Sequence, residues 1–420
     1  MKYYDVILRK EFVNDCEAKG NIKFADISDE LALEIVKKHL RTTVNNECLR
    51  EPTGIMKYKF LVPGGGYTTL WDWDSFFMAC SVDEELLEYS KGSVCNLIEN
   101  MGKDGRPAKN LSPDGEVDTR TTALPLQAQY AYIIAKRIGD FSWVEKYWDR
   151  FEKMIEWFDM YRTNNGYYVY QNIFGNGIDN NPSVYGRGTM STSPCDLISF
   201  MYRELCAMKK LAHMFHPERE EHYRVKAETL REFFREKYFD RMDKCFYAID
   251  CNINPGETTM QEINWVTYLK FRSWANIFPL WAGLATKEQA ECVHKYIMSE
   301  EHFLSVCGIR SHAKSDPIYN NVPMGNPSNW QGPVWGLSTF LTAYALARYG
   351  YYEDALNAAM RLIKTYAQDI LQNGCVHEFY HGDTGQPVIR PNFTSWNIMA
   401  LKVIDDIKEN KDVTTFDLLD

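Results

Sequence analysis

The feature that most constrains this fold is an apolar stripe that recurs along the chain with the period of an α-helix. It is clearest in segments 143–161 and 195–215, where apolar side chains recur every three or four residues. Counted over the whole chain, the pattern predicts about twelve helices. These helices are joined alternately by short turns and by long loops rich in Gly, Pro, Asn and Trp. We therefore expect an all-α fold in which paired helices form a toroid.

The expected helices and strands can be placed along the chain from periodicity and capping residues. The first helix, for example, can be capped by Ser28 or Asp29 and carries Leu31, Ile35, Val36 and Leu40 on one face. One helix starts at Trp71–Phe77, and the others cover about 29–44, 84–101, 122–138, 143–161, 195–215, 218–239, 274–284, 287–298, 334–349, 353–371 and 394–408. The expected strands are few and short, at 166–170 and 245–249. No change of composition marks a linker, so we expect one domain over 1–420, with loops 102–118 and 312–329 as possible lids. A solenoid is the alternative, but no internal repeat supports it.

Composition narrows the classes of function. The chain contains 11 Trp, 26 Tyr and 22 Phe, an aromatic excess that suits a protein that stacks sugar rings, although a large core would also hold many of them. The net charge is −10 and no basic run stands out, which argues against nucleic acid or an anionic membrane as partner. A small carbohydrate is the expected partner.

Cysteine usage and hydropathy indicate a cytoplasmic protein. The 11 cysteines include no C-x-x-C pair, so we expect a reducing compartment, no disulfide framework and no zinc site. The first twelve residues lack the apolar core of a signal peptide. No stretch approaches the roughly 20 apolar residues of a membrane span.

The segment 174–185, FGNGIDNNPSVY, carries a single carboxylate, Asp179, in a predicted ordered loop. Its three Asn, two Gly and one Pro disfavour a helix or a strand. Aromatic residues lie on both sides in the sequence: Tyr167, Tyr168, Tyr170, Phe174 and Tyr185. Among aromatic rings an aspartate would have the raised pKa that a general acid needs. The alternative is an Asx-turn in a surface loop.

The segment WDWDSFF, residues 71–77, follows a Gly-rich loop at a predicted helix start. Asp72 and Asp74 could simply be favoured by the positive end of the helix dipole. Trp71 and Trp73 favour a second interpretation, because a Trp face combined with a carboxylate that accepts hydroxyl hydrogen bonds is suited to holding a pyranose.

Two later loops hold the remaining candidates. Segment 329–336, NWQGPVWG, opens a predicted helix and contributes Trp330, Gln331 and Trp335. Segment 374–387 places Glu378 in a short extended piece between two turns.

Near Glu378, His377 and His381 have the i, i+4 spacing of a metal-binding pair, but the surrounding Gly and Pro disfavour a helix. We expect no metal and no cofactor. Because motifs for nucleophilic catalysis and phosphate binding are also missing, Asp179 and Glu378 are the best candidates for acid–base chemistry.

Taken in order, VPGGGYTTLWDWDSFF, GIDNNPS, NWQGPVWG and HEFYHGDTGQP resemble the motifs of glycoside hydrolase family 63, whose relatives include the trehalases. The resemblance spans roughly residues 63–396 and implies an (α/α)6 barrel with an inverting α-glycosidase activity. It matches Asp179 to the general acid and Glu378 to the general base. The residues that it places around the sugar are Tyr67, Trp73, Asp74, Trp330, Gln331 and Trp335.

This chain departs from the family pattern at three places, which affect the expected substrate rather than the chemistry. Gln331 stands where many members have Arg, Asn181 where Ser is usual, and Ala123-Leu124-Pro125 where many read polar-Pro-Pro. The short chain most resembles the mannosylglycerate and glucosylglycerate hydrolases, which implies a hexose α-linked to a small acid. Four cations lie in loops from which they could bind the acid: Arg106, Lys109, Arg120 and Arg187.

Other functions remain open at this point. An α-glucosidase acting on trehalose, kojibiose or nigerose would use the same residues. A sugar isomerase on the same barrel would instead use paired histidines, for which His312 and His377 could serve. The third alternative is a non-catalytic sugar-binding protein. The sequence does not specify the oligomeric state.

Overall fold

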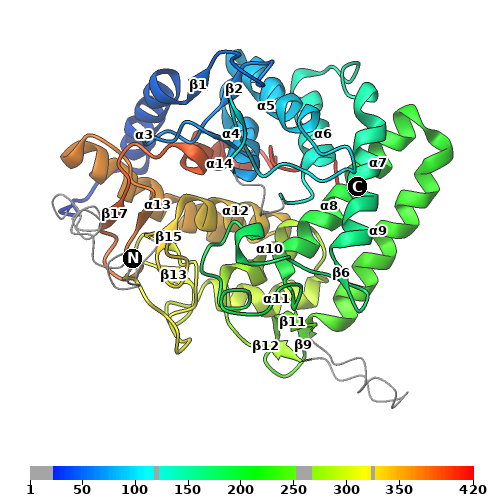
Figure 1. Cartoon of the computed structure of the whole chain (residues 1–420). Helices are drawn as coiled ribbons and strands as arrows, with labels where there is room; N and C mark the ends of the chain where they lie inside the picture. The colour runs from blue at the N-terminus through cyan, green and yellow to red at the C-terminus, as the bar shows by residue number, and fades with distance from the viewer. Residues whose placement is uncertain (1–21, 118–122, 252–266, 323–326) are drawn as a thin grey trace, which may run out of the picture.

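The computed structural model describes residues 22–117, 123–251, 267–322 and 327–420. Helices dominate it and surround an aromatic core (Figure 1). The α-helices are α3 (Asp29–Thr43), α4 (Asp72–Ser81), α5 (Leu87–Glu99), α6 (Gln127–Ile138), α7 (Trp148–Tyr161), α8 (Cys195–Phe215), α9 (Pro217–Lys237), α10 (Phe278–Trp281), α11 (Lys287–Ile297), α12 (Gly336–Arg348), α13 (Tyr352–Asn373) and α14 (Val403–Lys408). None of the described helices is long and apolar enough to cross a membrane.

Burial alternates between consecutive helices. α4 and α10 are buried on every side, and so is the 3-10 helix η6 (Ser395–Leu401). α6, α8 and α12 are buried over most of their length. Most helices between them bury one face only, as in α9, where only Tyr223, Ala227 and Phe234 are buried; α5 differs, because its second half is buried on every side. Inner helices therefore alternate with outer, amphipathic ones.

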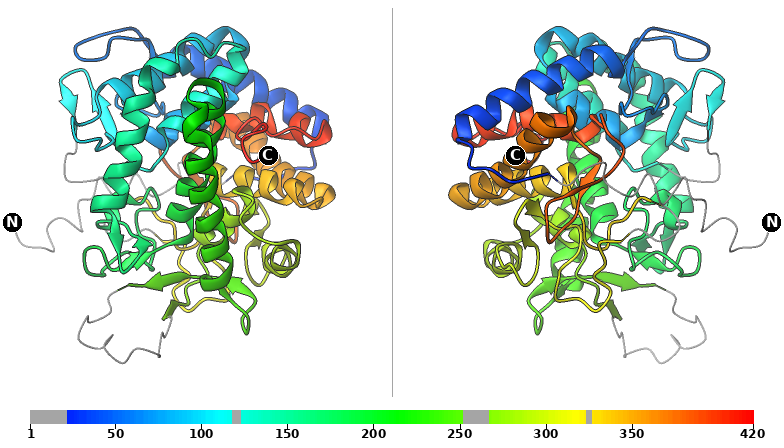
Figure 2. Two further views of the ribbon diagram at one scale, coloured as in Figure 1. Left: turned by 90° about the vertical axis from the view of Figure 1, so that its right-hand side faces the viewer. Right: turned by 90° about the vertical axis from the view of Figure 1, so that its left-hand side faces the viewer.

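The inner helices contact one another in sequence. α4 packs on α6, α6 on α8, α8 on α10, α10 on α12, and α12 on η6, which returns to α4. The outer helix α13 packs beside α3, so the first described helix meets elements from the C-terminal part of the chain; Figure 2 shows α3 in blue next to the red and orange C-terminal elements. The contacts thus form a closed circuit.

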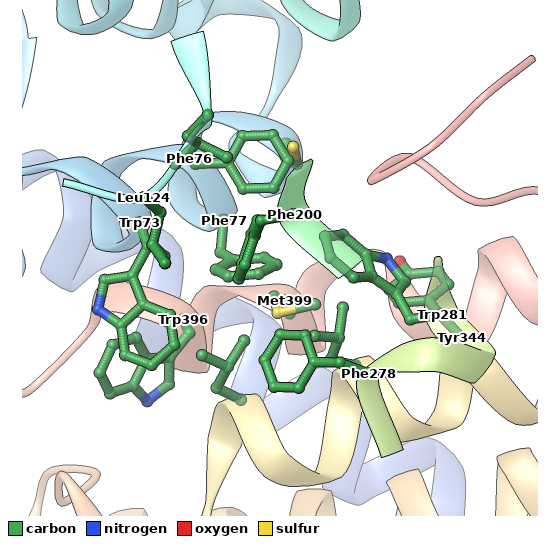
Figure 3. Close-up of a cluster of buried hydrophobic side chains, with 14 of the residues drawn as sticks. Trp73, Phe76, Phe77, Leu124, Phe200, Phe278, Trp281, Tyr344, Trp396 and Met399 are labelled. Atoms are coloured by element: carbon green, nitrogen blue, oxygen red, sulfur yellow. The ribbon is translucent and has the colours of Figure 1, made fainter. Parts of the chain in front are cut away.

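Aromatic side chains from several inner helices fill the centre of this circuit (Figure 3). Phe77 of α4 lies 6.0 Å from Trp281 of α10, measured between ring centroids, and Phe200 of α8 lies 5.5 Å from the same indole. Trp73 of α4 lies 5.4 Å from Trp396 of η6. Rings at these separations pack favourably. This core continues into the loops at one end of the helices through Trp73.

The strands are short, antiparallel and confined to the connections. They are β1 (Leu49–Arg50), β2 (Phe60–Leu61), β3 (Leu70–Trp71), β4 (Asn110–Ser112), β5 (Gly115–Glu116), β6 (Thr163–Asn164), β7 (Tyr167–Tyr168), β8 (Thr192–Ser193), β9 (Phe239–Asp240), β10 (Cys245–Phe246), β11 (Ala248–Asp250), β12 (Tyr268–Leu269), β13 (Leu304–Ser305), β14 (Gly308–Ile309), β15 (Val334–Trp335), β16 (Phe379–Tyr380) and β17 (Pro387–Ile389). Pairing of β15, β16 and β17 joins the segment around 334–335 to the segment 379–389.

Most predicted helices are confirmed, and three details differ. Ser28 caps α3 by accepting a hydrogen bond from the Leu31 N–H (3.2 Å), but Leu31 itself is exposed rather than on the buried face. The expected helix 394–408 is split into η6 and α14. The strands are short, as predicted, but they are not few in the described residues, because pairing between distant loops leaves no local periodic signal.

Candidate active site

A cavity of about 290 Å³ opens among the loops at the end of the aromatic core. This volume is close to the lower end of the usual range for small-molecule sites, roughly 300–1,000 Å³. Five of its lining residues are tryptophans and three are carboxylates: Trp71, Trp73, Trp330, Trp335, Trp396, Asp74, Asp179 and Glu378. The cavity therefore offers flat apolar faces together with strong hydrogen-bond acceptors, a combination suited to a sugar.

Eight of the nine residues proposed from the sequence line this cavity. They are Tyr67, Trp71, Trp73, Asp74, Asp179, Trp330, Trp335 and Glu378. Gln331 is not among the described lining residues. Its side-chain N–H donates to the backbone oxygen of Asn180 (2.9 Å), so it holds the loop that carries Asp179. Of the two proposed lids, loop 102–118 contributes Lys109, and loop 312–329 contributes Pro327 and Ser328; residues 118 and 323–326 lie outside the described residues.

Asn180 fixes the loop of Asp179 to the loop of Trp330. Its side-chain oxygen accepts from the Trp330 N–H (2.7 Å), and its side-chain N–H donates to Asn329 Oδ1 (2.9 Å). On the other side of the acid, Gly177 lies against the Trp73 indole so closely that a Cβ atom there would be 2.3 Å from Cζ2. Asp179 is therefore held between two tryptophan-bearing segments.

The environment of Asp179 suits a proton donor. Burial raises the pKa of its carboxyl, while the positive charge of Lys109 and a hydrogen bond with the Ser328 hydroxyl act in the opposite direction. Four tyrosines near Asp179 in the sequence do not line the cavity: Tyr167, Tyr168, Tyr170 and Tyr185. Tyr170 instead donates to Asp196 (3.0 Å), and Tyr185 is exposed. The expectation that those rings surround Asp179 was wrong, because the surrounding indoles come from other loops.

Glu378 lies directly before β16 and is 5% exposed. Burial raises its pKa to about 8; Arg390 lowers it, and the charges of Asp74 and Asp179 raise it further. Glu378 Oε2 accepts no hydrogen bond from the described residues, so no such bond to this oxygen keeps the base ionised. The nearest cationic group is Arg390, whose Nε lies 3.6 Å from that oxygen.

Asp74 is the third carboxylate of the cavity and lies in the first turn of α4. Burial raises its pKa to about 7, although Ser395 Oγ donates a hydrogen bond to Asp74 Oδ1 (2.7 Å). Asp72 lies outside the cavity and accepts from the Leu124 N–H (3.1 Å). The two aspartates of WDWDSFF therefore differ: Asp74 faces the ligand space, and Asp72 anchors the segment before α6.

Indole groups provide donors as well as stacking faces. Trp330 stacks on Trp335 with the ring centroids 3.9 Å apart. The buried N–H groups of Trp71, Trp330 and Trp396 have no hydrogen-bond partner among the described residues, and all three indoles line the cavity. Buried indole N–H groups usually find a partner, so hydroxyl groups of a bound sugar are suitable acceptors. Trp396 was missed in the sequence as a site residue.

The four proposed carboxylate-binding cations have different positions. Arg106 forms a two-pronged ion pair with Glu116, and Arg187 pairs with Asp250. Arg120 lies outside the described residues, and Lys109 lines the cavity. A further lining cation, Arg390, was missed, since a single Arg after a short apolar run carries no sequence signal.

The two histidines of the isomerase alternative, His312 and His377, interact with carboxylates away from the cavity. His377 Nδ1 lies 2.7 Å from Asp369 Oδ2, which also accepts from the Tyr380 hydroxyl (2.6 Å). Asp369, Cys375 and His377 are the one group in the described residues that brings three potential metal ligands within 4.8 Å of one another, but their atoms already form this hydrogen-bonded cluster. His312 pairs with the buried Asp316 (3.1 Å). Neither His312 nor His377 lines the cavity, which argues against the isomerase alternative.

Comparison with known proteins decides the class. Residues 67–396 match the model of the mannosylglycerate hydrolase MGH1-like glycoside hydrolase domain. The chain belongs to this family. It is therefore a glycoside hydrolase, and the matched segment contains Asp74, Asp179 and Glu378.

Solved structures share the fold of this MGH1-like domain at low sequence identity. A GH63 mannosylglycerate hydrolase from Thermus thermophilus, in complex with Tris and D-glycerate, superposes with a TM-score of 0.64 at 17% identity, covering 87% of this chain and 99% of that one. Neutral trehalase Nth1 from Saccharomyces cerevisiae superposes with a TM-score of 0.63 at 17% identity, covering 92% and 83%.

A curated relative extends the comparison to a longer protein. The uncharacterized protein YMR196W of Saccharomyces cerevisiae is 26% identical over 186 residues. The aligned stretch covers 30% of this chain and only 17% of that protein.

Proposed function

We propose that this glycoside hydrolase is an inverting, exo-acting α-glycosidase that releases a terminal hexose from a small α-glycoside, with glucosylglycerate or mannosylglycerate as the preferred substrate. One catalytic domain, an (α/α)6 barrel over residues 1–420, would carry the activity. The observation that carries the proposal is that Asp179 and Glu378, from loops far apart in the chain, line one cavity with Asp74 and the indoles.

In the proposed reaction, Asp179 protonates the glycosidic oxygen as the bond to the anomeric carbon breaks. Glu378 takes a proton from a water molecule that attacks the anomeric carbon from the opposite face, which inverts its configuration. The two carboxyl groups should then be about 6.5–9.5 Å apart, leaving room for the water. Asp74 and Trp73 would hold the sugar, and Asp74→Ala should reduce turnover of every substrate.

The size of the cavity and the crowding of its loops support an exo-acting pocket for a small substrate. The ten described cysteines are all free thiols, which supports our placement of the enzyme in the cytoplasm. The likeness to mannosylglycerate hydrolase supports an acidic aglycone, while the likeness to a trehalase keeps trehalose among the candidates.

The decisive experiment follows the anomeric configuration of the released hexose by proton NMR. An α-linked substrate should release the β-anomer first, before mutarotation, and early α-anomer would refute the inverting mechanism. Candidate substrates are glucosylglycerate, mannosylglycerate, trehalose, kojibiose, nigerose and maltose. Asp179→Asn and Glu378→Gln should each lower kcat at least about a hundredfold, without loss of folding. If a variant keeps more than about a tenth of the wild-type kcat, the residue that was replaced does not have the role assigned to it.

A further inference from the structure

Arg390 has an unusual backbone conformation beside the proposed base. It follows β17 directly and precedes Pro391, and its φ is +48°. Side-chain-bearing residues rarely adopt this left-handed conformation, and a following proline favours an extended one instead. Gly or Asn would adopt it with less strain. A strained residue at the edge of a functional cavity suggests that its side chain has a task there.

The guanidinium of Arg390 is positioned but not saturated. It lies over the Tyr67 ring, 4.8 Å from the centroid, and its Nε is 3.6 Å from Glu378 Oε2, longer than a hydrogen bond. It makes no hydrogen bond to any of the described residues, although a guanidinium carries five N–H donors. Its side chain is 45% exposed, whereas that of Glu378 is 7% exposed, so Arg390 lies toward the open side of the cavity.

The charges of the cavity explain what such a group would bind. Glu378 is ionised when it acts as base and would repel an acidic substrate, so entry of a carboxylate requires a cation with available donors. Lys109, the other lining cation, is 9% exposed, and its charge lowers the pKa of Asp179 and of Asp72. Arg390 is the more accessible of the two, and its planar fork matches a carboxylate with two parallel hydrogen bonds.

We propose that Arg390 binds a carboxylate on the aglycone at the open side of the cavity and thereby makes the enzyme prefer acidic over neutral aglycones. This inference rests on the proposed function. The competing role of Arg390 is that of a charge partner for Glu378 alone, which would affect all substrates equally.

The test compares two substrates that differ in one group: glucosylglycerate, with a carboxylate, and glucosylglycerol, with a hydroxymethyl group in its place. Arg390→Asn suits the left-handed backbone and removes the charge, while Arg390→Lys keeps the charge without the fork. Lys314→Met is the matched control, because Lys314 has a similarly exposed side chain (49%) but pairs with Asp383 away from the cavity.

We expect Arg390→Asn to lower kcat/KM for glucosylglycerate about 10- to 100-fold and for glucosylglycerol less than about threefold, since hydrogen bonds to charged groups have energies of this order. For glucosylglycerate, the kcat/KM of Arg390→Lys should lie between those of wild type and Arg390→Asn, and the kcat/KM of Lys314→Met should match that of wild type. Equal losses on both substrates, or a wild-type enzyme with no preference between them, would overturn the proposal.

If wild type hydrolyses neither substrate, the proposed function fails and the Arg390 site is decided by binding alone. Isothermal titration calorimetry would then use D-glycerate, with glycerol as the neutral match. Binding of D-glycerate that is lost in Arg390→Asn but kept in Lys314→Met supports the anion site. Binding that is absent in wild type, or unchanged in Arg390→Asn, refutes it.

Discussion

The buried His377–Asp369 pair should make the stability of this enzyme depend on pH in a way that one substitution removes. Asp369 is fully buried at the end of α13 and accepts hydrogen bonds from His377 Nδ1 (2.7 Å), the Tyr380 hydroxyl (2.6 Å) and the Asn373 side chain (2.7 Å). Burial lowers the pKa of His377, but the hydrogen bonds and charges of Asp369 and Cys375 outweigh it and raise the pKa to about 9.

The expected magnitude follows from this pKa. The difference between the ordinary histidine value of 6.5 and about 9 corresponds to roughly 3 kcal/mol, because one pKa unit is 1.36 kcal/mol. A group whose pKa is higher in the folded state than in the unfolded chain contributes its full stabilisation when the pH is below its pKa in the unfolded chain. The stabilisation therefore persists below about pH 6.5 and is lost as the pH rises to about 9.

Urea unfolding at several pH values between 6 and 10 would measure this effect in Asp369→Asn and in wild type. Raised carboxyl pKa values, such as that of Glu378, also make stability fall with pH, so the quantity to compare is the difference between the two proteins. We expect Asp369→Asn to cost about 3 kcal/mol more at pH 6 than at pH 9.5. The control is Asp354→Asn, which breaks a more exposed pair with His294. A destabilisation by Asp369→Asn that is constant across this range would refute the reasoning.

Three further predictions concern the site. Gly177→Ala should push Trp73 and Asp179 apart, costing about 1–3 kcal/mol of stability and at least about tenfold in kcat, as measured by denaturation and steady-state kinetics; wild-type values for both would show that the loop tolerates a Cβ. The acidic limb of the kcat/KM profile should lie near pH 8, because Glu378 must be ionised to act as base and its pKa is raised to about 8; a limb near pH 4.5 would contradict this environment. Exhaustive EDTA treatment should leave activity unchanged; loss that added Zn²⁺ or Ca²⁺ restores would reveal a required ion.

The helices could be predicted from the sequence wherever one face was apolar and a boundary residue marked the end. α8 was predicted at its observed limits, and Ser28, one of the two residues expected to cap α3, does so. Helices buried on every side gave weaker boundaries: the expected 274–284 helix proved to be η5 (Trp274–Ile277) followed by α10. A segment that is apolar on every side has no helical periodicity in its sequence, so its ends cannot be predicted from the pattern.

The candidate site could be predicted as far as its residues lie in distinctive loops. Asp179, Glu378 and the Trp-bearing motifs do, and they line one cavity. Gln331 was misplaced, because its side chain turns to the backbone of Asn180. Arg390 became apparent only in the structure, since its position depends on strand pairing between β16 and β17.

The contact between η6 and α4 means that the active site is completed only late in protein synthesis. Ser395, which hydrogen-bonds to Asp74, lies 321 residues after it, and Trp396 covers the indole of Trp73. At translation rates of about 5–20 residues per second, α4 waits tens of seconds for this partner. During that time its apolar surface is uncovered and prone to aggregation. A ribosome stalled between residues 379 and 394 would thus leave a chain that holds both Asp179 and Glu378 but lacks the segment that completes the site, and that chain would be a substrate for chaperones.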